Sequence, residues 1–485
     1  MDSTCFYPLN MTRNILASMF FLISTCMYAG AQIFNVLEYG AVNDGKTIST
    51  AEIQKTIDKC SESGGGTVEF TAGRYLSGTI FLKSNVTMHL SAGAILEGSK
   101  NINDYPVTPY QVRSYTDNYT NRSLIYAEDL KSVSITGEGT INGNGSSFQV
   151  PDEQVKKSLF DSYRVRPYII RFVNCEDINI KDITLINSPM WVQHYLLCRN
   201  VYISGIRVRS QVNRNNDGID IDACENVRIS DCDIKSGDDA IVIKSTLSKP
   251  CRNVTVTNCL ISSDCNGFKL GTESNGDFQN ITLSNCIIYN TKLAAIALEM
   301  VDGGKMNNVS VSGVNMDSVG CVLFIRLGNR ARPYKENMEK PGMGRLSGIM
   351  VSNIQATNAG PVGCSITGLP AFSATKISLR DIRINFVGGG TGDLVSRKIE
   401  EYPDKYPEYR MFGMLPAYGF YCRHVSGLYM ENIELSFEKT DYRPPLYFQD
   451  VDGATISDLK AFYAKGIESP VVTDSCRNIK IRNNF

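Results

Sequence analysis

Three aspartates, Asp217, Asp238 and Asp239, are the residues of this sequence whose types and spacing could best support chemistry. Each lies in a glycine-containing turn that leads into a short strand-like run. Asp217 and Asp239 are 22 positions apart, close to one repeat of the chain, so stacked repeats would bring the carboxylates together. No cation adjoins them in the sequence. Mutual repulsion then raises the pKa of at least one carboxyl group, which places a proton donor beside a proton acceptor.

Two structural roles compete with catalysis for these aspartates. Clustered carboxylates can hold a calcium ion, and aspartate side chains commonly cap turns by accepting hydrogen bonds from the backbone. Spacing alone does not choose among the three roles. A zinc-type site is not indicated, because the sequence lacks Cys-x-x-Cys pairs with histidine partners.

A repeated pattern positions these residues. A small or apolar residue is followed by x-Asn-Val-x-Ile or a close variant, and the best copies are 23 to 28 residues apart. They begin at Cys175, Cys198, Cys224, Cys251, Phe278 and Met306. Short strands with this period predict a solenoid whose rungs bury their apolar faces against one another. We predict an all-β fold, a right-handed parallel β-helix; a β-propeller, the alternative, needs longer repeats.

One end of such a solenoid exposes strand edges and core unless something covers it. Residues 49–60 have apolar positions at helical spacing, and Ser49 with Glu52 forms a capping-box pattern. A run of three glycines follows. We therefore predict a short N-terminal helix that caps the solenoid. Strands are expected next at residues 67–70, 79–82 and 86–90.

Aligning the alternating strands places their outward side chains in three columns. The columns are Asp217, Asp239, Asn266 and Ala294; Asp220, Val242, Lys269, Ala297 and Phe324; and Asp222, Lys244, Gly271, Glu299 and Arg326. Charges of opposite sign follow one another along the third column. Asp222–Lys244 and Glu299–Arg326 are therefore expected to form ion pairs, a role that we favour over catalysis for those residues.

Fifteen cysteines would suggest disulfide bonds in an exported protein. Their spacing indicates something else, because Cys232, Cys259 and Cys286 follow one another at intervals of 27 residues, the same interval as Cys224 and Cys251. Equivalent positions in successive rungs predict ladders of small buried side chains in place of a disulfide framework.

The first 31 residues have the pattern of a signal peptide. Arg13 precedes an apolar run at residues 15–27, and Ala29-Gly30-Ala31 fits small-x-small cleavage. A membrane anchor is the alternative, but the run is short for a span. We predict that residues 32–485 form a single catalytic β-helix domain, secreted or periplasmic, monomeric and free of the membrane. The net charge of −1 argues against nucleic acid as a partner.

Several segments outside the aspartates are also distinctive. They include Phe34-Asn-Val-Leu-Glu-Tyr-Gly-Ala, Gly137-Glu-Gly-Thr-Ile-Asn-Gly, Arg166-Pro-Tyr-Ile-Ile, Asn187-Ser-Pro-Met-Trp and Pro416-Ala-Tyr-Gly-Phe-Tyr. Asn215-Asn216-Asp217 and Asp238-Asp239 follow in order at rung spacing. Together these segments, which span nearly the whole chain after residue 31, resemble the polygalacturonase family, glycoside hydrolase family 28, in its bacterial-type members.

The resemblance implies a right-handed parallel β-helix that hydrolyses pectic polysaccharide or oligosaccharide, of polygalacturonan or rhamnogalacturonan type, with inversion. In the family's scheme the first aspartate of the pair is the general acid, here Asp238. The other two, Asp217 and Asp239, activate the water. The resemblance implies no metal or organic cofactor.

The sequence departs from the family's pattern at three positions. The family's Gly-His-Gly motif appears as Cys265-Asn266-Gly267, and its Arg-Ile-Lys motif as Ala297-Leu298-Glu299. In the family those cations hold a substrate carboxylate, which Glu299 would repel. Nearby cations could compensate; more simply, the sugar beside the scissile bond is neutral. His194, about one rung before Asp217, is expected to line the cleft, with a buried structural role as the alternative. We expect substrate contacts from His194, Lys244, Asn266, Lys269, Glu299 and Arg326.

Two stretches interrupt the repeat. Residues 326–345 are rich in arginine and lysine, and residues 388–420 contain Tyr402, Tyr406, Tyr409 and Tyr418. Insertions in solenoids form loops, often on the binding face. These tyrosines could stack on sugar rings or cover the surface of the solenoid.

Two other functions stay open. A pectate-lyase-type β-eliminase would use a calcium ion, which the three aspartates could hold, together with a cationic base. A non-catalytic carbohydrate-binding β-helix would account for the missing histidine and cations.

Overall fold

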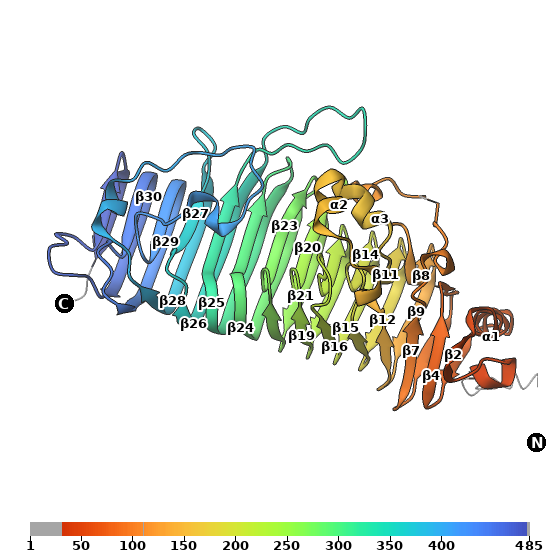
Figure 1. Cartoon of the computed structure of the whole chain (residues 1–485). Helices are drawn as coiled ribbons and strands as arrows, with labels where there is room; N and C mark the ends of the chain where they lie inside the picture. The colour runs from red at the N-terminus through yellow and green to blue at the C-terminus, as the bar shows by residue number, and fades with distance from the viewer. Residues whose placement is uncertain (1–31, 110, 483–485) are drawn as a thin grey trace, which may run out of the picture.

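The computed structural model describes residues 32–109 and 111–482, and the predicted signal peptide at residues 1–31 lies outside them. The described chain winds into a long stack of parallel strands, drawn from the N-terminal to the C-terminal end in Figure 1. Each strand pairs in parallel with the equivalent strand one rung away. The predicted all-β fold and parallel β-helix are confirmed.

The strands fall into three rows that run along the stack. The row that carries the site contains β5 (Ile80–Phe81), β8 (Ser123–Glu128), β11 (Tyr168–Val173), β14 (Gln193–Leu196), β17 (Ile219–Asp222), β20 (Ile241–Ser245) and β23 (Phe268–Ser274). The second row contains β1 (Ile33–Asn35), β3 (Gly66–Phe70), β6 (Val86–Leu90), β9 (Lys131–Thr136), β12 (Glu176–Lys181), β15 (Arg199–Ser204), β18 (Glu225–Ser230) and β21 (Cys251–Thr257). The third row contains β2 (Asp44–Ile48), β4 (Gly73–Ser77), β7 (Ala94–Gly98), β10 (Thr140–Asn142), β13 (Thr184–Ile186), β16 (Arg207–Ser210), β19 (Asp233–Ser236) and β22 (Leu260–Ser263).

Longer strands continue these rows towards the C-terminus. They are β24 (Phe278–Met300), β25 (Lys305–Leu327), β26 (Arg345–Ala359), β28 (Ala374–Gly388), β29 (Phe420–Lys439) and β30 (Leu446–Ala461), with the shorter β27 (Cys364–Thr367), β31 (Val471–Asp474) and β32 (Arg477–Arg482). β24 pairs with β21, β22 and β23, so a single strand passes through all three rows.

The asparagine of the repeated pattern has two structural roles. Asn226, Asn253 and Asn280 each have a positive φ of 56–59°, the left-handed turn conformation that asparagine tolerates better than most residues. The side-chain amide of Asn253 donates to Asn226 at 2.9 Å, and that of Asn280 donates to Asn253 at 2.9 Å. The same residue therefore makes the turn in each rung and ties neighbouring rungs together.

The predicted cysteine ladders are confirmed. The thirteen cysteines among the described residues are all free, and most are buried in the core. The backbone N–H of Cys259 donates to Cys286 Sγ at 3.4 Å, one rung on. Together with inward isoleucine and valine side chains such as Ile229 and Val256, these thiols fill the interior of the stack.

The register of the second outward column, which begins at Asp220, is as predicted. Asp220 pairs with Val242, Val242 with Lys269, Lys269 with Ala297, and Ala297 with Phe324. In the third column Asp222 pairs with Lys244 and Glu299 with Arg326 in backbone register. Between β20 and β23 the register shifts after Ile243, which moves the side chains that follow.

Helices are few. α1 (Thr50–Glu62) lies at the N-terminal end of the stack and buries Ile53, Thr56, Ile57 and Cys60 against the first strands. Its N-cap, Ser49, makes no side-chain capping bond, so the predicted capping box is wrong. The Ser49 hydroxyl instead accepts from the backbone N–H of Val42 at 2.9 Å, because the chain folds back on it there.

Two short helices were not predicted. α2 (Asp152–Lys157) and α3 (Leu159–Arg164) follow β10 and lie on the same side of the stack as the loop between β25 and β26 (Figure 1). The six short 3-10 turns are η1 (Val36–Tyr39), η2 (Ile102–Asp104), η3 (Tyr115–Asn118), η4 (Gly145–Phe148), η5 (Gly392–Ser396) and η6 (Tyr409–Phe412), counted over the described residues. In that same part of the chain, no helix has the length and apolar character that crossing a membrane requires.

Candidate active site

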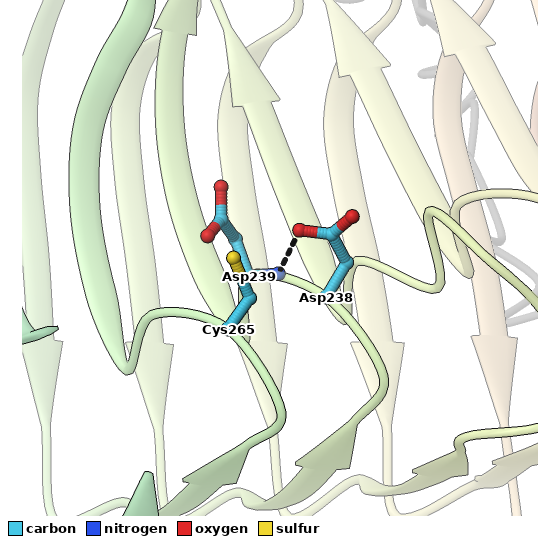
Figure 2. A group of neighbouring side chains, drawn as sticks. All are labelled: Asp238, Asp239 and Cys265. Atoms are coloured by element: carbon cyan, nitrogen blue, oxygen red, sulfur yellow. Dashed lines mark hydrogen bonds between the residues drawn. The ribbon is translucent and has the colours of Figure 1, made fainter. Parts of the chain in front are cut away.

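The three aspartates meet in one pocket of about 220 Å³ on the row of β17, β20 and β23. Asp217 lies just before β17, and Asp238 and Asp239 lie just before β20, so neighbouring rungs bring them together. We call these three residues the acid cluster. Figure 2 shows Asp238 and Asp239 side by side, with Cys265 of the next rung beside Asp239.

Asp239 is held as a carboxylate. Its Oδ1 accepts from Asn266 Nδ2 at 2.7 Å, and its Oδ2 lies 3.1 Å from Lys269 Nζ. Burial by itself raises the pKa of Asp239, but Lys269, Lys244 and the Asn266 amide outweigh it, so the pKa lies below its ordinary value. Asp239 is therefore ready to accept a proton.

The pKa of Asp238 is shifted in the opposite direction. Its Oδ1 accepts from the backbone N–H of Asp239 at 3.0 Å, the dashed line in Figure 2, and Asn215 Nδ2 lies 3.5 Å from Oδ2. Burial, and after it the negative charge of Asp239, raises the pKa of Asp238. The pKa values of these two adjacent carboxyl groups are thus shifted in opposite directions. Such a pair can supply a proton donor, Asp238, and a proton acceptor, Asp239.

Asp217 and Asp220 add further buried acid. Asp217 is 3 % exposed and its Oδ1 has no hydrogen-bond partner; Asp220 is fully buried and neither of its oxygens is hydrogen-bonded. Burial raises both pKa values well above normal; the charge of Asp220 raises the pKa of Asp217 further, and the charge of Asp239 raises the pKa of Asp220. Lys244 Nζ lies 3.9 Å from Asp217 and 3.8 Å from Asp220, and it partly offsets this repulsion.

The sequence suggested an acid cluster without a neighbouring cation, and this was wrong. Lys244, at the far end of β20, and Lys269, in β23, both reach the carboxylates. A lysine side chain is long enough to reach the next rung, so these contacts could not be recognised from separation in the sequence.

A family model described as glycosyl hydrolases family 28 matches residues 60–400. The chain belongs to glycosyl hydrolases family 28.

Two relatives agree with this family 28 membership, and one solved structure shows the same fold. A probable polygalacturonase of Vitis vinifera is 36 % identical over 223 residues, 44 % of each chain. An exo-poly-alpha-D-galacturonosidase of Dickeya chrysanthemi is 28 % identical over 264 residues, 45 % of this chain and 43 % of the relative. The chain thus matches a little under half the length of each. The structure of a Thermotoga maritima exopolygalacturonase, 24 % identical, superposes with a TM-score of 0.67 over 84 % of this chain and 92 % of that one.

Both expected ion pairs of this family 28 chain are absent, although the backbone register is as predicted. Asp222 accepts from the backbone N–H of Thr246 at 2.9 Å and from the Thr246 hydroxyl at 2.6 Å. Lys244 instead lies 3.3 Å from Glu273. The register shift after Ile243 brings Glu273 to the lysine and leaves Asp222 facing the Thr246 turn.

The second expected pair is absent because both side chains contact other partners. Glu299 lies 3.7 Å from Lys269 and accepts from the Thr272 hydroxyl at 2.9 Å. Arg326 donates to backbone carbonyls, at 2.6 Å to Glu401 and 3.1 Å to Tyr402. Arg326 is 1 % exposed, so it holds the loop above it and does not face the pocket.

His194 does not line the cleft. Its side chain is fully buried, its Nε2 lies 3.2 Å from Asp222 Oδ2, and the Trp191 ring packs against it with centroids 5.1 Å apart. Burial lowers the pKa of His194 to about 4, so the imidazole is neutral at ordinary pH. The buried structural role is the one that the geometry supports.

Of the six expected substrate contacts, Lys244 is the one that lines the pocket. Asn266, Lys269 and Glu299 lie behind it, with exposed fractions of 5 %, 2 % and 1 %. Asn266 and Lys269 bond to Asp239 and so act on the acid cluster instead of reaching solvent.

Sequence reasoning missed several residues around the pocket. Glu273 bonds Lys244 and also contacts Arg332, a residue of the basic stretch. Tyr406, from the tyrosine-rich stretch, accepts from Lys269 Nζ at 3.3 Å at the rim. Glu273 lies two positions beyond Gly271 of the third column, and continuing the alternation of outward side chains along β23 could have found it. Aromatic and apolar side chains complete the lining: Tyr115, Tyr119, Leu159, Phe160, Tyr163, Met190 and Trp191.

Proposed function

We propose that this chain is a glycoside hydrolase that cleaves glycosidic bonds of pectic polysaccharide or oligosaccharide with inversion. The observation that carries the proposal is the opposite pKa shift of two adjacent carboxyl groups, raised for Asp238 and lowered for Asp239. Family 28 membership supports the reaction class and the pectic substrate.

The proposed reaction needs one acid and one base. Protonated Asp238 gives its proton to the glycosidic oxygen as the bond from that oxygen to the anomeric carbon breaks. A water molecule adds to the opposite face of the sugar, and Asp239 takes a proton from it. The proton then returns to Asp238 through solvent. Asp217 is proposed to orient the attacking water beside Asp239; burial and Asp220 raise the pKa of Asp217, so Asp239 is the group that takes the proton.

Lys269 and Asn266 position Asp239 in this proposal. Together they contact both oxygens of its carboxylate, so its orientation and its charge are fixed before substrate binds. Lys269 is therefore a positioning residue, and Asn266 fills the place of the family's histidine with a different donor.

Product analysis tests the proposal. The purified protein is incubated with polygalacturonan and with rhamnogalacturonan, with and without a chelator, while new reducing ends and ultraviolet absorbance from unsaturated sugar are followed. Reducing ends without absorbance, insensitive to chelator, are expected. Chelator-sensitive absorbance would mean a lyase whose aspartates bind calcium, and binding without turnover would mean a carbohydrate-binding β-helix.

We further infer a role for α1 as the cap of the first rung, since four of its side chains are buried against that end. The solenoid is proposed to wind right-handed, as parallel crossovers nearly always do. We also propose that residues 32–485 act as one catalytic domain, exported after removal of residues 1–31, monomeric and without membrane contact. Size-exclusion chromatography of the exported protein tests the monomeric state, and N-terminal sequencing tests the removal of residues 1–31.

A further inference from the structure

The pocket has a wall on the N-terminal side of the acid cluster. Residues 111–122, which we call the strap, lead into β8 but reach across the row, where the backbone N–H of Tyr115 donates to Thr246 O at 2.8 Å. Arg171 of β11 donates to Thr120 O at 3.2 Å and holds the returning strap over the strands.

The strap meets α3 across the row. The Tyr119 ring of the strap packs edge-to-face on Tyr163 of α3, with centroids 5.0 Å apart, and on Trp191 at 5.3 Å. Tyr163 and Trp191 are 8 % and 4 % exposed, so little space is left between the rings. Arg166, just after α3, donates to Arg214 O at 2.7 Å and so links α3 to the loop that precedes Asp217. A polysaccharide lying along the row would collide with this aromatic wall.

The C-terminal side is filled as well. Residues 389–419, which we call the insertion, cover the row beyond β23. Ala294, Ala297 and Phe324 of the row form one apolar cluster with side chains of the insertion. The insertion residues of that cluster include Ile399, Tyr409 and Phe412, and Ala297 and Phe324 are both fully buried.

The insertion is fastened by arginines of the row. Arg326 donates to Glu401 O, and Arg423 donates to Ile399 O at 2.6 Å. Ala297 therefore lies beneath a protein segment in the place where a longer groove would continue. The pocket that holds the acid cluster therefore lies between these two walls.

The charges of the pocket select against an acidic sugar. Its lining holds four acidic side chains, Asp217, Asp238, Asp239 and Glu273, and two cations, Lys244 and Arg332. Both cations contact Glu273, and Arg332 also lies over the Tyr115 ring, 3.4 Å from its centroid. No cation of the lining is left to bind a substrate carboxylate, whereas the aromatic wall suits the apolar face of an uncharged ring.

We propose that this pocket takes one uncharged sugar at the end of a chain or branch, end-on, and that the enzyme releases it as a monosaccharide. The proposal rests on the proposed hydrolase function and adds its mode of attack and the class of sugar. The two walls are the reason that we expect end-on entry. The contacts of both cations with Glu273 are the reason that we expect an uncharged sugar.

Two oligosaccharide sets of equal length test the proposal, one ending in rhamnose, xylose or galactose and the other in galacturonate at the same end. From the earliest time points we expect free monosaccharide and a product one unit shorter, with kcat/KM at least tenfold higher for a neutral end. Internal fragments at early times, or a preference for the galacturonate end, would overturn it. No turnover of any glycan would instead contradict the hydrolase function.

Two variants probe the two halves of the proposal. Glu273→Gln frees Lys244 and Arg332, so KM for galacturonate-ended chains should fall relative to KM for neutral-ended chains. Tyr119→Ala opens the wall and should add internal cleavage products; Tyr202→Ala, an exposed tyrosine of β15, is the matched control. If either variant fails to fold, the wild-type product size and the wild-type ratio of kcat/KM still decide.

Discussion

The ammonium group of Lys269 lies between two buried carboxylates of neighbouring rungs, 3.1 Å from Asp239 and 3.7 Å from Glu299. Its charge keeps the pKa of Asp239 low, while Glu299, more distant and fully enclosed, has a pKa raised to about 7. One lysine thus fixes the protonation of the proposed base and leaves a second acid that titrates near neutrality.

Removing this lysine should shift the pH profile of activity. Lys269→Met alone would leave Glu299 buried without a partner, at a cost of about 3–5 kcal/mol, so the double variant Lys269→Met/Glu299→Gln is used. Without the cation the pKa of Asp239 rises, and because the base works only when ionised, the acidic limb of kcat/KM should move to higher pH. Lys305→Met, an exposed lysine of β25, is the control. An unmoved acidic limb in the double variant would contradict the role of Lys269.

Glu299 should make stability depend on pH. Burial is the main cause of its raised pKa, from 4.5 to about 7, which Lys269 only partly opposes. The folded state therefore binds this proton more tightly than the unfolded state, so the stabilisation is complete below about pH 4.5 and is lost as pH rises to about 7. The loss amounts to about 3 kcal/mol. Denaturant unfolding from pH 4 to pH 8 should show Glu299→Gln gaining that much on the wild type, whereas exposed Glu138→Gln should parallel the wild type.

Asp238→Asn should abolish turnover while the fold persists. An amide cannot donate the proton that the leaving oxygen needs, and general acid catalysis typically contributes about 10²–10⁴-fold. The measurement is kcat on the preferred glycan, with circular dichroism to check folding. Asp231→Asn, an exposed aspartate of the same stack, should keep wild-type activity. Near-normal kcat in Asp238→Asn would remove Asp238 from the role of general acid.

Arg326→Met should loosen the insertion. The substitution leaves the carbonyls of Glu401 and Tyr402 without their buried donor, at about 1–3 kcal/mol. Limited proteolysis should then cut within residues 389–419 sooner than in the wild type, and activity should fall because Tyr406 moves with the insertion. Arg380→Met, a half-exposed arginine of β28, is the control and should be cut at the wild-type rate. Equal cleavage rates for all three proteins would count against this anchoring.

Reducing agents should not change stability. The described cysteines are free thiols at ladder positions of the core, so no bond is present for a reductant to break. Thermal midpoints with and without dithiothreitol should agree, and thiol titration of unfolded residues 32–485 should find thirteen groups. A midpoint that falls by several degrees on reduction would reveal a disulfide.

The regular part of the fold could be predicted because its signals are local and repeated. The asparagine of each rung specifies its turn, the alternation of apolar side chains specifies the strands, and the period specifies the stacking. Even the pairing of Asp220 with Val242 and of Val242 with Lys269 followed from counting along aligned strands. A shift of one residue would turn every inward side chain outward, which fixes the register strongly.

The sequence by itself determined the rungs, the cysteine ladders and the meeting of Asp217, Asp238 and Asp239. Only the tertiary structure decided which cations reach those carboxylates, that His194 is buried beneath Trp191, and that Ala297 lies under the insertion. The physical reason is that backbone pairing repeats from rung to rung, whereas long side chains and irregular loops choose partners by proximity in space. Lys244 leaves its register neighbour Asp222 for Glu273, and the strap meets α3 through single aromatic contacts that no repeat encodes.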